Sequence, residues 1–207
     1  MRKRIVFLLI ACFGMLAAMA DETPNEKQAR RIFDDAYNKV FGEQGSTLTY
    51  DVNIIGIYKT KGTITFKGKK QHFVDERVST WNDGKTAYMA WRKKHTVEIH
   101  DANSDKKDKY SGRFKFTLDD FTYNVEKAPE GLLLTLKQKK GAKGSIKEVK
   151  AIVKEGTHVP VRLRIKVAFI WTTVKISNFR SGGIDDGQFV FPREKYKDWK
   201  FVDKRKN

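Results

Sequence analysis

The sequence predicts a mainly β (α+β) fold: an open, strongly curved antiparallel half-barrel of about ten or eleven strands, with one N-terminal helix as its lid or plug. Two observations support this prediction. Apolar residues recur at steps of three and four in residues 23–42, and they alternate with polar residues through most of the chain that follows. Because one amphipathic helix cannot bury its own apolar face, the sheet must curl around it.

Residues 1–20 have the features of a secretory signal peptide. A basic start is followed by an apolar run and by the small residues Ala18 and Ala20. The run is shorter than the roughly 20 apolar residues of a membrane-spanning helix. Lipid attachment at Cys12 is an alternative, but the apolar run continues past that residue. We therefore expect cleavage after Ala20 and a periplasmic protein with one domain over residues 21–207. That domain has no cysteine, which excludes disulfides and thiolate chemistry.

The ends of the helix are predicted as clearly as its periodicity. Thr23 suits the N-cap, Pro24 suits the first helical position, and Glu26 completes a capping box. Gly42 suits the residue just after the helix. The apolar face consists of Ala29, Ile32, Phe33, Ala36, Tyr37, Val40 and Phe41.

The strands follow in order, separated by turns rich in glycine and lysine. Residues 48–54 alternate strictly between apolar and polar side chains, and residues 62–67 repeat the pattern. Asp83 and Gly84 predict a two-residue hairpin between the next two strands. Further strands are expected at 95–100, 123–126, 132–137, 146–154, 161–167, 173–179 and 188–191, with a long loop over 101–112.

The net charge of +17 narrows the choice of partners. A strongly basic protein can bind nucleic acid or an anionic membrane. An exported protein rarely meets nucleic acid, and the lysines are spread along strands rather than gathered. We therefore interpret most of them as solvated outer-face residues and expect no nucleic acid. Transient contact with an anionic membrane is the alternative.

The sequence contains no nucleophile elbow, metalloprotease helix motif or phosphate-binding loop. His95 and His100 are five residues apart on a predicted strand, so they point to opposite faces and cannot share a metal. Adjacent carboxylates on a helix or strand also diverge. This applies to the pairs Asp34-Asp35, Asp119-Asp120 and Asp185-Asp186. We therefore predict no enzyme, no catalytic or metal site and no cofactor.

The predicted binding surface consists of apolar side chains on the inner face of the curved sheet and on the helix. Periodicity alone favours side chains that simply fill a core; the sharper hypothesis is an apolar cavity for a lipid or an acyl chain. The sequence pattern does not decide which side chains of residues 86–91 face inward. The residues predicted to line the site are Ile32, Phe33, Ala36, Val40, Leu48, Tyr50, Val52, Ile54, Ile64, Phe66, Val97 and Ile99.

Several segments, in order and spacing, resemble the LolA-type periplasmic carriers of outer-membrane lipoproteins. They are the leading helix and residues 62–68, 82–86, 154–160, 174–179, 185–191 and 196–205. The resemblance implies an open antiparallel β-barrel with a helical lid over an apolar cavity. It further implies a chaperone for lipoprotein acyl chains, with an inner-membrane lipoprotein-releasing transporter as donor and an outer-membrane acceptor. We expect a monomer.

One departure from the family pattern concerns the lid. The arginine that closes the family's lid is matched here by Gly68, flanked by Lys67, Lys69 and Lys70. A lysine supplies a point charge without the fixed guanidinium fork. Two hypotheses therefore stand: a lipid or lipoprotein carrier with a yielding lid, and a non-carrier binding module of the same fold, such as an envelope sensor, with a packed interior.

Overall fold

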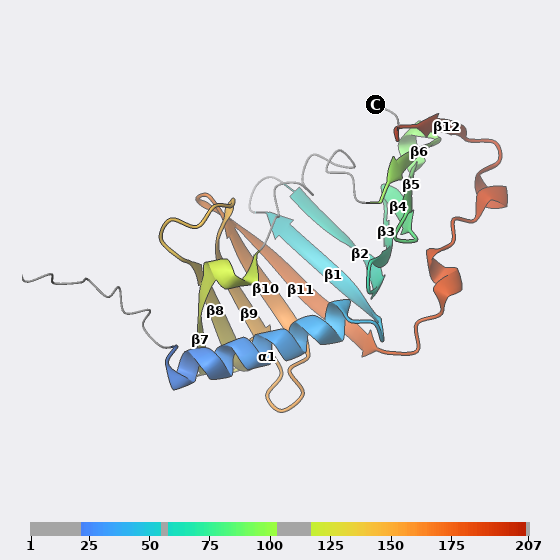
Figure 1. Ribbon diagram of the computed structural model, residues 1–207. Coiled ribbons are helices and arrows are strands. Elements are labelled where there is room, and N and C mark those ends of the chain that lie inside the picture. The colour runs from blue at the N-terminus through green and yellow to red at the C-terminus, as the bar shows by residue number, and fades with distance from the viewer. Residues whose placement is uncertain (1–21, 55–57, 103–116, 206–207) are drawn as a thin grey trace, which may run out of the picture.

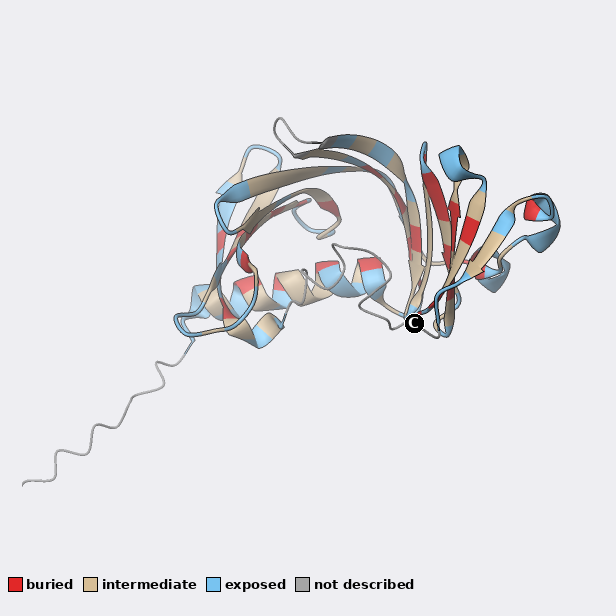
Figure 2. Ribbon diagram, turned by 90° about the horizontal axis from the view of Figure 1, so that it is seen from above, coloured by how far each residue is buried: buried red, intermediate tan, exposed pale blue. Residues whose placement is uncertain are grey.

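The computed structural model describes residues 22–54, 58–102 and 117–205. The predicted signal peptide and most of the predicted loop 101–112 lie outside these ranges. Within them, twelve strands form one sheet that bends into an open arch, and a single long helix crosses its concave side (Figures 1 and 2). This confirms the predicted curved, open antiparallel sheet with an N-terminal helix, although the number of strands exceeds the prediction.

The elements follow the chain in a simple order. Helix α1 spans Pro24–Phe41, and the strands are β1 (Ser46–Ile54), β2 (Tyr58–Lys67), β3 (Lys70–Asp75), β4 (Val78–Asn82), β5 (Thr86–Trp91), β6 (Thr96–Asp101), β7 (Phe121–Ala128), β8 (Gly131–Gln138), β9 (Ile146–Val153), β10 (Pro160–Val167), β11 (Ile170–Ser181) and β12 (Lys200–Asp203). Short 3-10 helices are η1 (Arg92–Lys94), η3 (Leu118–Asp120), η4 (Asp186–Phe189) and η5 (Arg193–Tyr196). The strand order is β12-β6-β5-β4-β3-β2-β1-β11-β10-β9-β8-β7.

The helix begins as predicted. The Thr23 side chain accepts a hydrogen bond from the backbone N–H of Glu26, and the Glu26 carboxylate accepts one from the Thr23 N–H at 2.8 Å. Gly42 differs from the prediction, because its φ of −70° is not left-handed. A Cβ at Gly42 would lie 2.4 Å from the Asn38 carbonyl oxygen, so close backbone approach explains the glycine.

The predicted hairpin at Asp83-Gly84 is present, but Asp83, Gly84 and Lys85 connect the two strands, where two residues were predicted. Gly84 has a φ of +94°, and the Asp83 carboxylate accepts hydrogen bonds from the N–H groups of Lys85 and Thr86, both at 2.8 Å. The turn sets β4 and β5 in register, with Asn82 opposite Ala87. Aspartate is common in turns because its carboxylate can accept hydrogen bonds from backbone N–H groups of the same turn.

The predicted last strand, 188–191, is wrong. The Asp185 carboxylate accepts a hydrogen bond from the Gly187 N–H at 2.7 Å and starts η4 instead. The chain then runs along the outer face of β3–β6 and adds β12 parallel to β6 at the edge (Figure 1). We call residues 184–203 the C-terminal segment.

Three apolar clusters form the core. The first joins the N-terminal half of α1 to the inner faces of β7–β10, and the second joins Val40 at the end of α1 to β1, β2, β3 and β11. The third lies on the outer face of β3–β6, where Trp81, Ala90 and Val97 pack against Tyr196 of the C-terminal segment. Among the described residues, no helix is apolar and long enough to cross a bilayer.

His72 generates a prediction about pH. Its ring stacks on Trp81 with centroids 5.1 Å apart, and its Nε2 is buried without a hydrogen-bond partner in the part of the chain described. Burial lowers the pKa of His72. The unfolded chain, with a histidine pKa of about 6.5, therefore binds the proton more readily than the native state. The free energy of unfolding therefore keeps the contribution of His72 above about pH 6.5, and it decreases as the pH falls below that value.

Urea unfolding of His72→Phe should accordingly show a weaker fall in stability between about pH 7 and pH 5 than the unsubstituted protein, whose slope from this group is at most about 1.4 kcal/mol per pH unit. His95→Asn, at an exposed position with a φ of +46° that asparagine tolerates, is the matched control and should keep the original slope. Equal slopes for His72→Phe and the unsubstituted protein would contradict this assignment.

Candidate functional site

The concave side of the arch carries a central strip of apolar side chains that are neither buried nor free. They belong to β10, β11, β1 and β2, between the cluster at one end of α1 and the cluster at the other. All six are half-buried: Leu163, Ile165, Val174, Ile176, Val52 and Ile64. We call this set the central strip. Half-exposed aliphatic groups on several adjacent strands are unusual for a filled core and resemble the lining of a binding site.

The geometry of α1 explains why the strip stays half-exposed. The helix has 18 residues, so it is about 27 Å long. In the order of the sheet, β8, β9, β10 and β11 lie between β7 and β1. The helix contacts β7 at its start and β1 and β2 at its end, and the sheet arches over it between these contacts (Figure 2). Under the arch, the strip side chains of β10, β11, β1 and β2 pack at the margins of the two clusters and stay half-buried.

Most of the predicted site residues lie around this strip. Ile32 and Ala36 are buried in the first cluster and Phe33 packs beside them, whereas Val40, Leu48 and Tyr50 form the second cluster. Val52, Ile64 and Phe66 pack half-buried against the second cluster. The side chain of Ile54 lies outside the described part. Whether any of these residues contacts a ligand stays a prediction.

Val97 and Ile99 are not brought together with this set. Register places Ile99 opposite Tyr88, which is opposite Trp81, and Val97 opposite Ala90. Directly paired residues share one face of a sheet, and this is the outer face under the C-terminal segment. Val97 is 0% exposed there. The prediction that Val97 and Ile99 line the concave side is therefore wrong.

A row of aromatic rings borders the concave side. The sequence pattern did not predict that these rings would contact one another. Phe33, Tyr37 and Phe41 follow each other at four-residue steps along α1, with centroid distances of 6.2 and 4.7 Å. The row continues to Tyr123 of β7 at 5.8 Å from Phe33 and to Phe66 of β2 at 4.7 Å from Phe41. We call these five residues the aromatic row. The apolar helix stripe and the i, i+4 spacing were the available signal.

The phenols of Tyr123 and Tyr50 are held neutral by burial. Burial raises the pKa of Tyr123 to about 12, and its hydroxyl donates to the Leu118 carbonyl at 2.8 Å. Burial also raises the pKa of Tyr50, whose ring stacks on Phe73 with centroids 5.4 Å apart. A Cβ at Gly62, opposite Tyr50, would lie 2.4 Å from the Tyr50 hydroxyl, so glycine leaves room for the ring.

Helix α1 is attached to the sheet by polar contacts at its margins. The Asn25 amide donates to the Val125 carbonyl at 2.8 Å and accepts from the Val125 N–H at 3.0 Å, as a partner strand would. The other flank holds Asp35, which contacts Lys39 at 2.6 Å and His158 at 2.7 Å. Lys39 and then His158 lower the pKa of Asp35. These groups are partly exposed, so each contributes modestly to stability.

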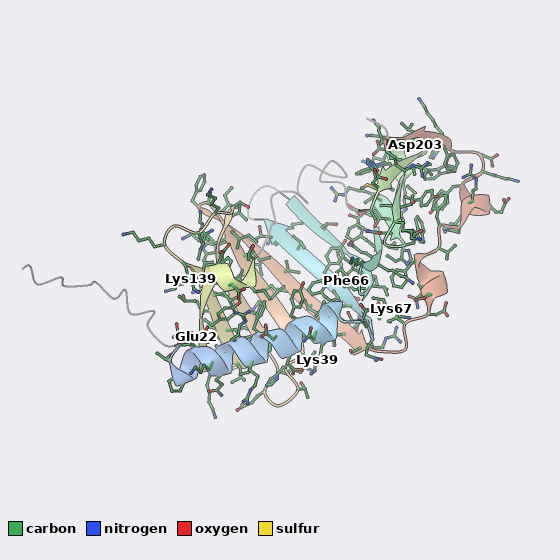
Figure 3. The ribbon with its side chains drawn as sticks, in the orientation of Figure 1. Glu22, Lys39, Phe66, Lys67, Lys139 and Asp203 are labelled. Atoms are coloured by element: carbon green, nitrogen blue, oxygen red, sulfur yellow. The ribbon has the colours of Figure 1, made fainter. Side chains whose placement is uncertain are left out.

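Two of the lysines beside Gly68 pair with the C-terminal segment rather than with the helix. Lys67 and Lys70 each place Nζ 2.9 Å from the carboxylate of Asp186, which lies in the C-terminal segment. These lysines lower the pKa of Asp186. Gly68 itself donates its N–H to the Gly42 carbonyl at 3.3 Å, at the end of α1. The position matched to the family's arginine therefore contacts the end of the helix only through its backbone N–H. Its neighbours Lys67 and Lys70 instead attach the C-terminal segment. Lys67 is labelled in Figure 3, next to Phe66 at the end of β2.

The two members of the pairs Asp34-Asp35 and Asp185-Asp186 have different partners, as their predicted divergence implies. Arg30 contacts Asp34 at 3.3 Å and Asp119 at 2.9 Å, and Asp185 and Asp186 bind a turn and two lysines. The buried carboxylate of Asp75 accepts bonds from the N–H groups of Arg77 and Val78, both at 2.8 Å. Within residues 22–54, 58–102 and 117–205, no three His, Cys, Asp or Glu side chains are grouped to hold a metal.

Comparison with known proteins gives structural likeness only. No protein-family model and no curated protein sequence matches the chain. Solved structures that match include lipoprotein LppX of Mycobacterium tuberculosis, with 10% identity over 77% of this chain and 98% of that one and a TM-score of 0.47. A DUF1329 family protein from Desulfovibrio piger has 15% identity over 81% and 98%, with a TM-score of 0.43. A LolA superfamily protein from Nitrosomonas europaea has 8% identity over 79% and 97%, with a TM-score of 0.38.

The fold observed in this chain is nevertheless the one that the sequence resemblance implied: an open, curved antiparallel sheet with one leading helix across its concave side. All three TM-scores lie below 0.5, so the functional argument below rests on this chain's own surfaces.

The attachment of α1 can be tested at Asn25. Asn25→Ala removes two hydrogen bonds to the backbone of β7 and should cost about 1–3 kcal/mol of local stability, because Val125 loses its partner. Trypsin cleavage after Arg30 or Arg31 under native conditions should then be about tenfold faster. Asn38→Ala, at an exposed position of the same helix, is the control and should leave the cleavage rate unchanged. Equal rates for both variants would show that Asn25 does not hold the helix.

Proposed function

We propose that this protein binds an acyl chain of a lipid or lipoprotein between the central strip and the aromatic row, with α1 as a displaceable lid. The observation that carries the proposal is the set of half-buried aliphatic side chains on β10, β11, β1 and β2, facing the side of the sheet that α1 crosses. These side chains gain further burial only if something apolar covers them. An acyl chain supplies apolar surface without needing a polar anchor.

The energies are compatible with a lid that yields. Burying an acyl chain stabilises by about 0.8 kcal/mol per CH₂, so a chain of about 14 methylenes gains on the order of 10 kcal/mol. The buried face of α1 consists of two alanines, one isoleucine and one valine, and burying an isoleucine or valine is worth about 1.5–3 kcal/mol each. With Phe33 and the Asn25 hydrogen bonds added, the attachment of the helix is of the same order as the gain from the ligand.

In the finer form of the proposal the protein is a periplasmic carrier. The signal peptide over residues 1–20 exports it, and the cargo passes from an inner-membrane lipoprotein-releasing transporter to an outer-membrane acceptor without a cofactor or catalysis. The family resemblance of the sequence supports this form. The non-carrier hypothesis differs in one physical respect, since it requires a packed interior that takes up no ligand.

A matched pair of substitutions on β11 tests the proposal. Val174 faces the concave side and Thr173 the opposite side of the same strand. Val174→Glu should weaken binding of a fluorescent palmitate analogue by at least about tenfold, because a carboxylate in an apolar site loses several kcal/mol of hydration. Thr173→Glu introduces the same charge on the other face and should bind normally.

Thermal melts distinguish a binding surface from a packed core. If the strip lines a ligand site, Val174→Glu should lose ligand while its melting temperature falls by only a few degrees, since the side chain is already half in water. A large loss of melting temperature, together with no uptake of the palmitate analogue by the unsubstituted protein, would support the packed module and overturn the carrier.

A further inference from the structure

The turn between β10 and β11 exposes a large aromatic side chain at its apex. Val167 pairs with Ile170, so Ala168 and Phe169 form the whole loop. Phe169 is 84% exposed, and Ile170 beside it is 38% exposed. Ala168 has a φ of +52°, a conformation that such turns usually assign to glycine. The sequence here departs from ordinary turn chemistry without gaining internal packing, and such departures tend to mark functional positions.

Basic side chains surround the next residue, Trp171. The Arg164 guanidinium carbon lies 4.8 Å from the ring centroid, and the Nζ atoms of Lys166 and Lys150 lie 5.7 and 5.8 Å away. Glu148 lies 3.5 Å from Lys150 and offsets part of this charge. Three cations around one indole, directly behind an exposed phenylalanine, combine an apolar tip with a positive collar.

The neighbouring turn adds more positive charge. The Ala168 N–H donates to the Ser145 carbonyl at 3.4 Å, which joins the β8–β9 and β10–β11 turns at the same end of the sheet (Figure 1). Lys139, Lys140 and Lys143 of the first turn are all exposed. Together, residues 139–150 and 164–171 contain seven lysines and arginines and one acidic residue, Glu148. We call this end of the sheet the basic tip.

We propose that the basic tip docks on the surface of an anionic lipid bilayer. Phe169 and Ile170 enter the interfacial layer, Trp171 lies at headgroup level, and the lysines and arginines meet the lipid phosphates. An exposed aromatic and an exposed aliphatic side chain next to several cations suit a bilayer, whose interface accepts both. Pairing one apolar anchor with a basic patch gives reversible attachment.

The proposal concerns the end of the sheet formed by the β8–β9 and β10–β11 turns. It does not depend on whether the concave side binds acyl chains, because Phe169, Ile170, Trp171 and the basic side chains of the tip belong neither to the central strip nor to the aromatic row.

Vesicle sedimentation tests the apolar part. The protein should bind vesicles of phosphatidylcholine with phosphatidylglycerol and should bind pure phosphatidylcholine vesicles much more weakly. Phe169→Ser combined with Ile170→Ser should weaken binding to the anionic vesicles by about tenfold or more. Val190→Ser is the matched control: Val190 is 65% exposed but lies in the C-terminal segment, so its loss should change nothing. Circular dichroism should show that the tip variant keeps its fold.

A second pair of variants tests whether the lysines of the β8–β9 turn act locally or only through the net charge of the protein. Lys140→Gln with Lys143→Gln should weaken binding by about tenfold or more, since each cation near an anionic surface is worth about fivefold. Lys93→Gln with Lys197→Gln removes two exposed charges elsewhere and should have little effect. Equal losses in the two pairs would overturn the proposal, and so would equal binding to neutral vesicles or no binding to anionic ones.

Discussion

The structure depends on a mismatch between one helix and the concave face of a twelve-stranded sheet. A sheet this wide must curl, and curling brings inner apolar side chains from distant strands to face each other. The 18 residues of α1 contact β7 at one end and the start of β1 and the end of β2 at the other. Between these contacts the helix leaves the aliphatic side chains of β10, β11, β1 and β2 only half-buried. The half-buried central strip is therefore a consequence of geometry.

The outer face of the other half of the sheet is covered differently. The C-terminal segment packs Phe191, Tyr196 and Trp199 against Trp81 and Tyr88, with Phe191 stacked on Tyr88 at 4.5 Å. It is anchored by β12 and by the ion pairs of Asp186 with Lys67 and Lys70. The protein thus has an aromatic, strand-anchored cover on one side and a helix with a small apolar face and polar margins on the other. Of these two covers, helix α1 is the better suited to move.

Local chemistry in the sequence predicted the parts of the fold that local chemistry determines. The Thr23–Glu26 capping box, the Asp83-Gly84 hairpin and the alternation of Leu48, Tyr50 and Val52 are all present. The errors arise where the outcome depends on distant contacts. Val97 and Ile99 alternate like inner-face residues, but the apolar partner for β6 is a segment about 100 residues later in the chain, so that strand presents its apolar side outward.

The same limit applies to the candidate site. Leu163, Ile165 and Val174 alternate plainly in the sequence, yet periodicity does not say whether an inward side chain is covered. That depends on how far the helix reaches across the arch. The final strand failed for a local reason instead: the Asp185 carboxylate bonds the Gly187 N–H, and this short-range bond competes successfully with extension of residues 188–191.

The positions of the helix and the basic tip relate the two proposals. His158, Ser181 and Ser46, which contact the flank or the end of α1, all lie at the ends of strands opposite the β10–β11 turn. The helix therefore crosses one end of the curved sheet, and the tip lies at the other (Figure 1). A bilayer in contact with the tip would face the end of the central strip that α1 does not cross. An acyl chain that enters from that side would exchange contacts with lipid for contacts with protein. Few of its CH₂ groups would be exposed to water on the way, and each exposed CH₂ costs about 0.8 kcal/mol.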